Sequence, residues 1–361
     1  MSFWAPPPPP STKLGLTERF ALAGIHVSPL QLGAMSVGKW GSMGMGDMDK
    51  ESSFKLLDAY FDNGGNFIDT ANNYQDESSE TFVGEWAEQR NIRDQLVIAT
   101  KYTTNFKTRN DAFAQKISYV GNNIKSMHIS VEASLKKLRT TYIDILYLHW
   151  WDWDTGVEEV MNGLHNLVVQ GKVLYLGVSD TPAWVVSQAN QYARDHGKTP
   201  FVIYQASLAL APWGVIGQGK FRTDAEEEER RATGEKDRAL TNPQWERNDN
   251  EKKISYALEK VAAEVGTKSI TAVAIAYAMQ KVPYCFPIIG GRKVEHLMAN
   301  VEALDISLSD EQIAFLEGVV PFDPGFPITM IGDGSKTSAL LANAGAIVKQ
   351  PFPQAIRPTK N

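Results

Sequence analysis

The chain has 361 residues, of which 43% are hydrophobic and 22% charged, and its formal net charge is −6. This composition is typical of a globular protein with a large core, built as one large α/β domain or as two small ones. Nothing in it indicates a nucleic-acid partner, because proteins that neutralise phosphates usually carry a basic surplus. No run approaches the roughly 20 apolar residues of a membrane span, so we expect a soluble protein.

Cysteine and histidine are too sparse to suggest a disulfide or a metal site. The only cysteine is Cys285, so no intramolecular disulfide can form, and this usage is typical of a reducing compartment such as the cytoplasm. The six histidines never occur at metal-ligand spacing, so we expect no metal site. The first ten residues end in a run of prolines. They lack the features of a secretory signal, and we expect a solvated arm rather than a ligand for a proline-reading domain.

Short apolar runs alternate with segments of helical spacing along most of the chain. Helical spacing appears over 54–61, 160–168 and 254–262, and Ser309 with Gln312 forms a capping box. This alternation favours a parallel sheet, and the number of units favours a closed α/β barrel, the (β/α)8 or TIM barrel. We expect one domain, with an arm over 1–28, the barrel over 29–320 and a tail over 321–361 across a barrel end. The runs expected to be strands are 30–35, 66–70, 96–100, 143–148, 173–178, 201–205, 208–213 and 286–289.

A polar stretch over 213–253 interrupts this alternation and contains the charge run 224–231. Loops of this length in compact domains are usually covers over a functional site or disordered segments. The charge run itself is typical of a solvated helical face rather than of a binding patch.

One helix is missing where the alternation should continue. The runs 201–205 and 208–213 are separated only by Ala206 and Ser207. A crossover between parallel neighbours needs about a dozen residues or more, usually a helix. We therefore expect that the two runs cannot be parallel neighbours, so that the barrel is one strand short or one run leaves the sheet. Apolar side chains at this point should then meet solvent or a neighbouring chain.

Four side chains with complementary chemistry occur near predicted strand ends. Asp69, Lys101 and His149 lie at or just beyond such ends, and Tyr74 follows Asp69 by five residues. In a (β/α)8 barrel the carboxyl ends of the strands assemble the active site. An adjacent ammonium lowers the pKa of a phenol, a carboxylate keeps a buried lysine charged, and an imidazole can orient a carbonyl oxygen. Together the four predict a proton donor for carbonyl reduction; singly, each could be a cap, a surface charge or a core histidine.

The sequences around these residues resemble segments of the aldo-keto reductase superfamily. The similarity runs from about residue 29 to residue 322 and is greatest to the fungal aryl-alcohol dehydrogenase and norsolorinic acid reductase branch. It implies a TIM barrel of the aldo-keto reductase type with one βα unit, around 205–208, truncated. The segments are FIDTANNY at 67–74, IATKY at 98–102, DILYLHWWD at 144–152, GVSDTPAW at 177–184, YQAS at 204–207, APWGVIGQGKF at 211–221 and PIIGGRKVEHLMAN at 287–300.

The resemblance implies hydride transfer from NADPH to a small-molecule carbonyl substrate. Tyr74 would be the general acid, Lys101 and Asp69 would tune it, and His149 would orient the carbonyl. Basic residues at the adenosine end favour a 2′-phosphate, because a guanidinium pairs bidentately with phosphate. The residues implied in cofactor binding are Asp69, Ser179, Asp180 (where many relatives carry asparagine), Gln205, Gly217, Gly219, Lys220, Gly290, Arg292, His296 and Asn300.

The expected substrate mouth is aromatic, although the same side chains could instead pack the barrel against its helices. An aromatic aldehyde or a bulky polycyclic ketone would suit such a mouth. By analogy with fungal relatives, the protein would act in polyketide or meroterpenoid biosynthesis. Two alternatives are a non-catalytic nucleotide-binding regulatory subunit and a degenerate enzyme impaired by the missing helix. The residues expected at the substrate are Trp40, Tyr74, His149 and Trp150, with Tyr102, Phe106, Trp151 and Trp153 nearby.

Overall fold

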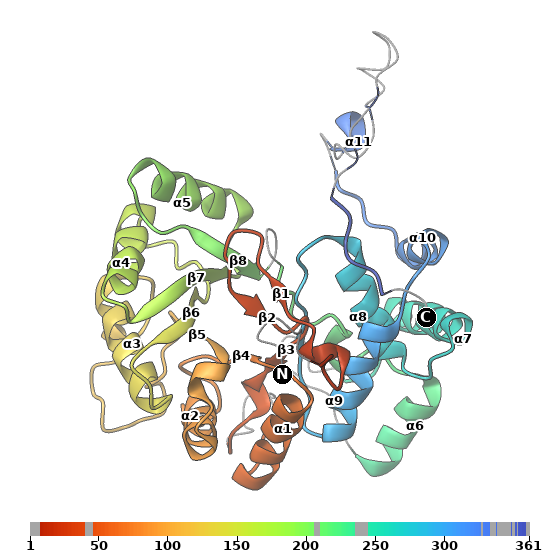
Figure 1. The fold of residues 1–361 in the computed structure, drawn as a ribbon, viewed down its shortest axis with the longest axis horizontal. Helices are drawn as coiled ribbons and strands as arrows, with labels where there is room; N and C mark the ends of the chain where they lie inside the picture. The colour runs from red at the N-terminus through yellow and green to blue at the C-terminus, as the bar shows by residue number, and fades with distance from the viewer. Residues whose placement is uncertain are drawn as a thin grey trace.

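The predicted strands form one curled, parallel sheet of seven strands (Figure 1). The computed structural model describes residues 8–39, 46–205, 210–234, 245–325 and 328–332, together with 337, 348, 351 and 353–358. Neighbouring strands follow the order β8-β7-β6-β5-β4-β3-β9. Their bounds are β3 Gln31–Gly33, β4 Phe67–Asp69, β5 Val97–Tyr102, β6 Ile143–Leu148, β7 Val173–Ser179, β8 Phe201–Gln205 and β9 Ile288–Ile289.

Helices α1 to α5 alternate with the strands and pack against the outside of the sheet, whereas α6, α7 and α10 lie to the other side of the molecule (Figure 1). Most of their buried side chains belong to the same apolar cluster as the outward-facing strand residues. The helices are α1 Lys50–Asp62, α2 Ser78–Arg90, α3 Ile124–Lys137, α4 Val157–Val169, α5 Ala183–Asp195, α6 Asp224–Thr233, α7 Asp249–Val265, α8 Ile270–Lys281, α9 Val294–Val301, α10 Asp310–Val319 and α11 Ile328–Ile331.

Local side chains decide where several helices begin. Asp49, Asn123 and Ser269 each accept a hydrogen bond from the backbone N–H three residues further on, at the starts of α1, α3 and α8. The predicted capping box of Ser309 and Gln312 is present at the start of α10. Such caps satisfy N–H groups that have no partner within the helix.

A short antiparallel hairpin closes the amino-terminal end of the barrel. Its strands are β1 (Glu18–Arg19) and β2 (His26–Val27). Phe20 in the hairpin is fully buried, and its ring lies 5.8 Å from Phe67 and 5.2 Å from Phe286. Phe67 begins β4 and Phe286 precedes β9, so the hairpin covers the amino-terminal ends of the strands. The opposite end, where the strands terminate, remains available for a site.

The barrel is closed by a short segment after β8. Leu210 makes parallel bridges both to Tyr204 on β8 and to Cys285 just before β9. Ala211 N–H donates to the Tyr204 carbonyl at 3.2 Å, and Ile288 N–H donates to the Pro212 carbonyl at 3.0 Å. Residues 210–212 thus link β8 to the chain around β9 through isolated bridges, without adding an eighth strand to the sheet.

The expected sheet of one strand fewer was confirmed, since the sheet has seven strands, but the expectation that the two runs cannot be parallel neighbours was wrong. The segments on either side of the missing helix are parallel neighbours, because Leu210 returns beside Tyr204 after only six positions. Residues 206–209 lie outside the described part of the chain. The overlap is a single bridge rather than a ladder, and this is why no long crossover is needed. The apolar side chains of β8 do not meet solvent: Phe201 is 3% exposed, and Asn190 of α5 hydrogen-bonds its backbone on both sides. In the run that follows, Trp213 is 49% exposed, as expected for that run.

The described parts of the C-terminal tail do not lie over the barrel. Figure 1 shows α11 standing away from the body, and Phe322 is 87% exposed. Further along, Arg357 donates to the Leu308 carbonyl at 3.2 Å and to Asp310 at 2.7 Å, beside the start of α10. None of the described helices combines the length and apolar character that a membrane crossing requires.

Candidate active site

Three of the predicted site residues project from the carboxyl ends of adjacent strands. Asp69 is the last residue of β4, Lys101 is the penultimate residue of β5, and His149 directly follows β6. In the β5–β6 register, Lys101 lies beside Tyr147. Since the strands are parallel neighbours, these side chains reach the same end of the barrel, which is where (β/α)8 enzymes carry their active sites.

Asp69 and Lys101 form a buried ion pair. Lys101 Nζ lies 2.7 Å from both carboxylate oxygens of Asp69 and donates to the Thr70 carbonyl at 2.8 Å. The two side chains are only 5% and 1% exposed. Gln205 Nε2 donates to Asp69 Oδ1 at 3.2 Å, so a further oxygen lone pair is satisfied. A buried charge is tolerated only when it is paired and hydrogen-bonded in this way.

The pair keeps Lys101 protonated. Burial acts to lower the pKa of Lys101, but Asp69 and Tyr74 outweigh this effect and hold the pKa above its usual value of 10.5. Burial raises the pKa of Asp69, and the charge of Lys101 opposes that rise. An ammonium therefore stands beneath Tyr74 at neutral pH.

Tyr74 lies between Lys101 and His149. Lys101 Nζ is 5.1 Å from the centroid of the Tyr74 ring, and the His149 ring meets Tyr74 edge to face with centroids 5.9 Å apart. Burial raises the pKa of Tyr74 above its usual 10.0, although the charge of Lys101 acts to lower it. We expected the ammonium to lower this pKa, and the net direction is the opposite because withdrawal from water is the larger effect. Tyr74 thus holds its proton at neutral pH.

The turn after Tyr74 is strained. Gln75, Asp76 and Glu77 have φ angles of 52°, 50° and 73°, in the left-handed region that ordinary residues avoid at a cost of roughly 1–2 kcal/mol each. Gln75 Nε2 donates to the Met35 and Gly46 carbonyls at 2.9 and 2.7 Å. These contacts anchor the turn and so fix the position of Tyr74.

A lysine from α3 supports the same loop from outside. Lys137 Nζ donates to the Asn72 carbonyl at 2.9 Å and lies 3.2 Å from Glu77. Sequence reasoning missed Lys137, since 65 positions separate it from Asn72 and no local motif links them.

His149 is a neutral imidazole. Burial, followed by the charge of Lys101, lowers the pKa of His149 to about 3. Its Nδ1 lies 3.2 Å from Thr104 Oγ1, which sequence reasoning also missed. A neutral imidazole has one N–H donor, and the tautomer decides which nitrogen carries it.

A second polar cluster lies beside this group, at the ends of β7 and β8. Ser179 Oγ is 2.8 Å from Gln205 Oε1 and 2.6 Å from Asp180 Oδ2. Ser179 and Gln205 are buried, whereas Asp180 is exposed and has a left-handed φ of 42°. Gln205 joins this cluster to Asp69, so the structure brings these four predicted residues together.

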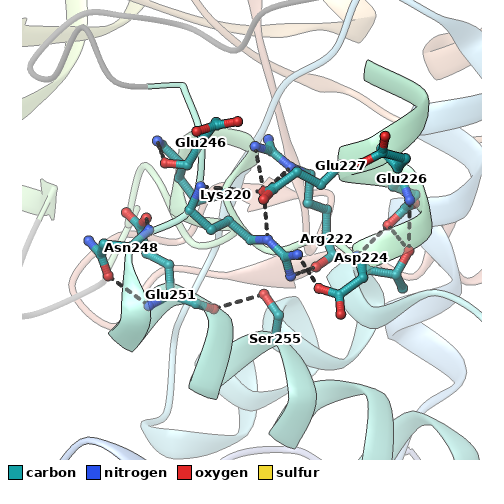
Figure 2. A network of polar contacts seen from close by, with 12 residues as sticks. Lys220, Arg222, Asp224, Glu226, Glu227, Glu246, Asn248, Glu251 and Ser255 are labelled. Carbon is teal, nitrogen blue, oxygen red and sulfur yellow. Dashed lines mark hydrogen bonds and ion pairs between the residues drawn. The ribbon is translucent and has the colours of Figure 1, made fainter. Parts of the chain in front are cut away.

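The polar stretch after Trp213 folds around a buried ion network (Figure 2). Glu227 Oε2 accepts from Arg222 Nη2 at 3.0 Å and from Arg247 Nε at 2.7 Å. The three side chains are 3% exposed or less. Our expectation of a solvated face for the charge run 224–231 was therefore wrong at Glu227, which faces inward because two buried guanidinium groups require a carboxylate.

Lys220 borders this network and the glycine-rich turn before it. It is 7% exposed, and its Nζ donates to the Glu246 carbonyl at 2.8 Å (Figure 2). Gly217 and Gly219 have φ angles of 60° and 95°. These conformations favour glycine. Within the turn, the Gly217 N–H donates to the Gly214 carbonyl at 2.8 Å and the Gly219 N–H donates to the Ile216 carbonyl at 3.2 Å.

The remaining predicted cofactor residues follow β9. Gly290 is the next residue after β9, and Arg292 and His296 are exposed at the start of α9. A methyl group on Gly46 would come within 3.1 Å of Arg292 Cδ, which places Arg292 against the loop before α1. Asn300 instead is 4% exposed and accepts from Thr271 Oγ1 of α8 at 3.2 Å.

Only part of the predicted aromatic mouth is accessible. Trp40 lies outside the described residues. Tyr102 and Phe106 are 0% and 3% exposed, so they pack in the interior. Trp153 is 66% exposed and faces the 62% exposed Trp184, with ring centroids 6.2 Å apart. Over the described ranges, no group of three or more His, Cys, Asp or Glu residues could hold a metal ion.

Comparison with known proteins identifies relatives along nearly the whole chain. A model of the aldo/keto reductase family matches residues 29–211 and 206–321. An "Aryl-alcohol dehydrogenase [NADP(+)]" of Phanerodontia chrysosporium is 60% identical, covering 100% of both chains. A putative aryl-alcohol dehydrogenase of Saccharomyces cerevisiae is 52% identical over 91% of this chain and 93% of its own. "Norsolorinic acid reductase B" of Dothistroma septosporum is 46% identical over 96% of this chain and 95% of its own.

The family match is divided at the point where the sequence lacks a helix. The two family matches meet at 206–211, where the sequence predicted the truncation. The alignment with the Phanerodontia protein spans 386 positions, against the 361 residues of this chain, a difference of 25. About 25 positions of the alignment therefore have no counterpart in this chain, enough for one helix and its connections. Both observations agree with the predicted truncation around residues 205–208.

Proposed function

Since this chain belongs to the aldo/keto reductase family, we propose that it is an NADPH-dependent oxidoreductase that reduces an aldehyde or ketone to an alcohol. The observation that carries the proposal is the arrangement of Tyr74 over the buried Asp69–Lys101 pair, with His149 against its ring. The NADP(+) in the name of the Phanerodontia relative supports the same cofactor.

The residues present fit such a cofactor. A buried hydroxyl and amide, Ser179 and Gln205, would hold the carboxamide together with Asp180. The turn at Gly217 and Gly219, where no side chain is in the way, would let the pyrophosphate approach the backbone beside Lys220. Gly290, Arg292 and His296 would hold the adenosine end, and an exposed guanidinium suits a 2′-phosphate. Asn300 would contribute only its remaining polar atoms, because its Oδ1 already accepts from Thr271.

Each of the four catalytic candidates (Asp69, Tyr74, Lys101 and His149) then has a distinct task. His149, neutral at physiological pH, donates a hydrogen bond that orients the substrate's carbonyl oxygen. NADPH, when bound, would supply the hydride for the carbonyl carbon. Tyr74, which still holds its proton, transfers it to the carbonyl oxygen as negative charge develops there. Lys101 stabilises the phenolate left on Tyr74, and Asp69 keeps Lys101 charged and in place.

We further propose an aromatic aldehyde or a bulky polycyclic ketone as substrate. The exposed pair of Trp153 and Trp184 offers flat apolar surface near the strand ends. Two relatives are named for an aryl alcohol and for norsolorinic acid, and this supports an aromatic substrate in fungal secondary metabolism. The lone cysteine, buried Cys285, supports a cytoplasmic location.

A stopped-flow screen of NADPH oxidation over aromatic aldehydes and polycyclic ketones tests this proposal. We expect turnover that requires both cofactor and carbonyl, together with a higher Tm when NADPH is added, because a ligand that binds only the folded state stabilises it. A higher Tm without turnover of any carbonyl would favour a nucleotide-binding regulatory subunit. Neither stabilisation nor turnover would favour an enzyme impaired by the missing helix.

A further inference from the structure

His149 and Trp150 share one hydroxyl partner. Thr104 lies in the loop after β5, and its Oγ1 is 3.2 Å from His149 Nδ1. The same oxygen accepts a hydrogen bond from Trp150 Nε1 at 2.9 Å. Because β5 and β6 are parallel neighbours, the loops that follow them place these three side chains together.

The indole fixes the direction of one of these two hydrogen bonds. An indole N–H can only donate, so Thr104 Oγ1 is the acceptor of the Trp150 bond. A hydroxyl has a single proton of its own to give. Among the hydrogen bonds of the described residues, the one acceptor within reach of the Thr104 hydroxyl proton is His149 Nδ1. An imidazole whose Nδ1 accepts carries its proton on Nε2 when it is neutral.

We propose that Thr104, held by Trp150, is a positioning residue that fixes His149 in the Nε2–H tautomer. The opposite tautomer would present a bare lone pair from Nε2, and a lone pair repels a carbonyl oxygen instead of orienting it. The catalytic consequence rests on the proposed reductase function, whereas the tautomer itself is a property of the protein without substrate.

The same geometry changes the role of Trp150. We expected Trp150 to contact substrate, and its indole N–H was available in principle as a donor. That donor is engaged with Thr104. Trp150 can therefore offer substrate only the face and edges of its ring.

Nitrogen NMR of protein labelled with ¹⁵N-histidine tests the tautomer directly. The chain has six histidines, and a His149→Ala variant identifies the His149 signals by their loss. We expect the parent to show an unprotonated Nδ1 and a protonated Nε2 at neutral pH. Thr104→Val removes the hydroxyl at nearly constant shape and should populate the Nδ1–H form, whereas Thr104→Ser should keep the parent pattern. A protonated Nδ1 in the parent, or an unchanged pattern in Thr104→Val, overturns the proposal.

Kinetic measurements distinguish a positioning role of Thr104 from a general loss of structure. For Thr104→Val we expect kcat to fall by about tenfold, the scale of one lost hydrogen bond to the reacting group, with the Kd for NADPH unchanged. Thr104→Ser should restore most of kcat, and Thr108→Val, in the exposed part of the same loop, should match the parent. Equal losses in the serine and valine variants would contradict the proposal. A parent without turnover, but with the expected NMR pattern, would reject the proposed function and leave the tautomer assignment standing.

Discussion

Replacing Glu227 by glutamine should loosen the polar segment that follows Trp213. Glu227 is 3% exposed, and its Oε2 accepts from Arg222 and Arg247, which are 2% and 1% exposed. The substitution keeps the shape but leaves two buried guanidinium groups without their shared carboxylate. Breaking a buried pair in this way costs about 3–5 kcal/mol. We take about 3 kcal/mol, because Asp224 still pairs with Arg247.

The effect should be local and measurable by hydrogen exchange. A loss of about 3 kcal/mol corresponds to opening that is roughly 150-fold more frequent. We therefore expect exchange over α6 and residues 245–248 to rise by about two orders of magnitude, while β5 is unchanged. Glu228→Gln is the matched control, since Glu228 is 72% exposed and its bond to Arg231 is worth ~1 kcal/mol at most. Equal protection from hydrogen exchange over α6 in Glu227→Gln and Glu228→Gln would refute the reasoning.

The difference in stability of this segment between the parent and Glu227→Gln should also depend on pH. Burial acts to raise the pKa of Glu227, but the hydrogen bonds and charge of Arg247, together with a hydrogen bond from Arg222, hold that pKa below its usual value of 4.5. A carboxylate with a lowered pKa stabilises the fold fully above its unfolded pKa and loses this contribution as pH falls through the folded pKa. Parent and Glu227→Gln should therefore differ most at pH 6–8 and converge below about pH 4.5.

Two further predictions concern the cofactor and the missing helix. NADPH should bind more tightly than NADH, and Arg292→Ala should remove most of that difference in a fluorescence titration, because the exposed guanidinium would pair with the 2′-phosphate; equal parent affinities for both cofactors would contradict this. Inserting the relative's segment of about 25 residues after Ser207 should raise Tm and soluble yield, because it restores a full crossover and cover. Unchanged Tm and yield would show that the short connection is sufficient by itself.

The sequence predicted where the site residues lie, but it did not predict the pKa of Tyr74. Asp69, Lys101 and His149 could be placed because strand ends can be recognised from short apolar runs, and parallel strands bring those ends together. The pKa of Tyr74 could not be predicted, since its direction depends on burial competing with the charge of Lys101. Thr104 escaped notice because a single threonine in a loop carries no pattern.

The fold, too, could be predicted in part from the sequence. Alternating apolar runs identified the barrel, and the two-residue spacing after β8 revealed the missing helix. How the chain closes there could not be predicted, because Leu210 needs only one bridge to Tyr204 where a full strand pairing was assumed. The inward position of Glu227 was hidden within a run of like charges, where the sequence does not distinguish a buried carboxylate from its solvated neighbours.

The central claim is that Tyr74 is the proton donor, and Tyr74→Phe tests it most directly. Single-turnover oxidation of NADPH with a reactive aromatic aldehyde should slow by at least ~100-fold, the scale of general acid catalysis. NADPH binding should be unchanged, and Tyr277→Phe on the outer helix α8 should behave as the parent. Near-normal turnover by Tyr74→Phe would contradict the account.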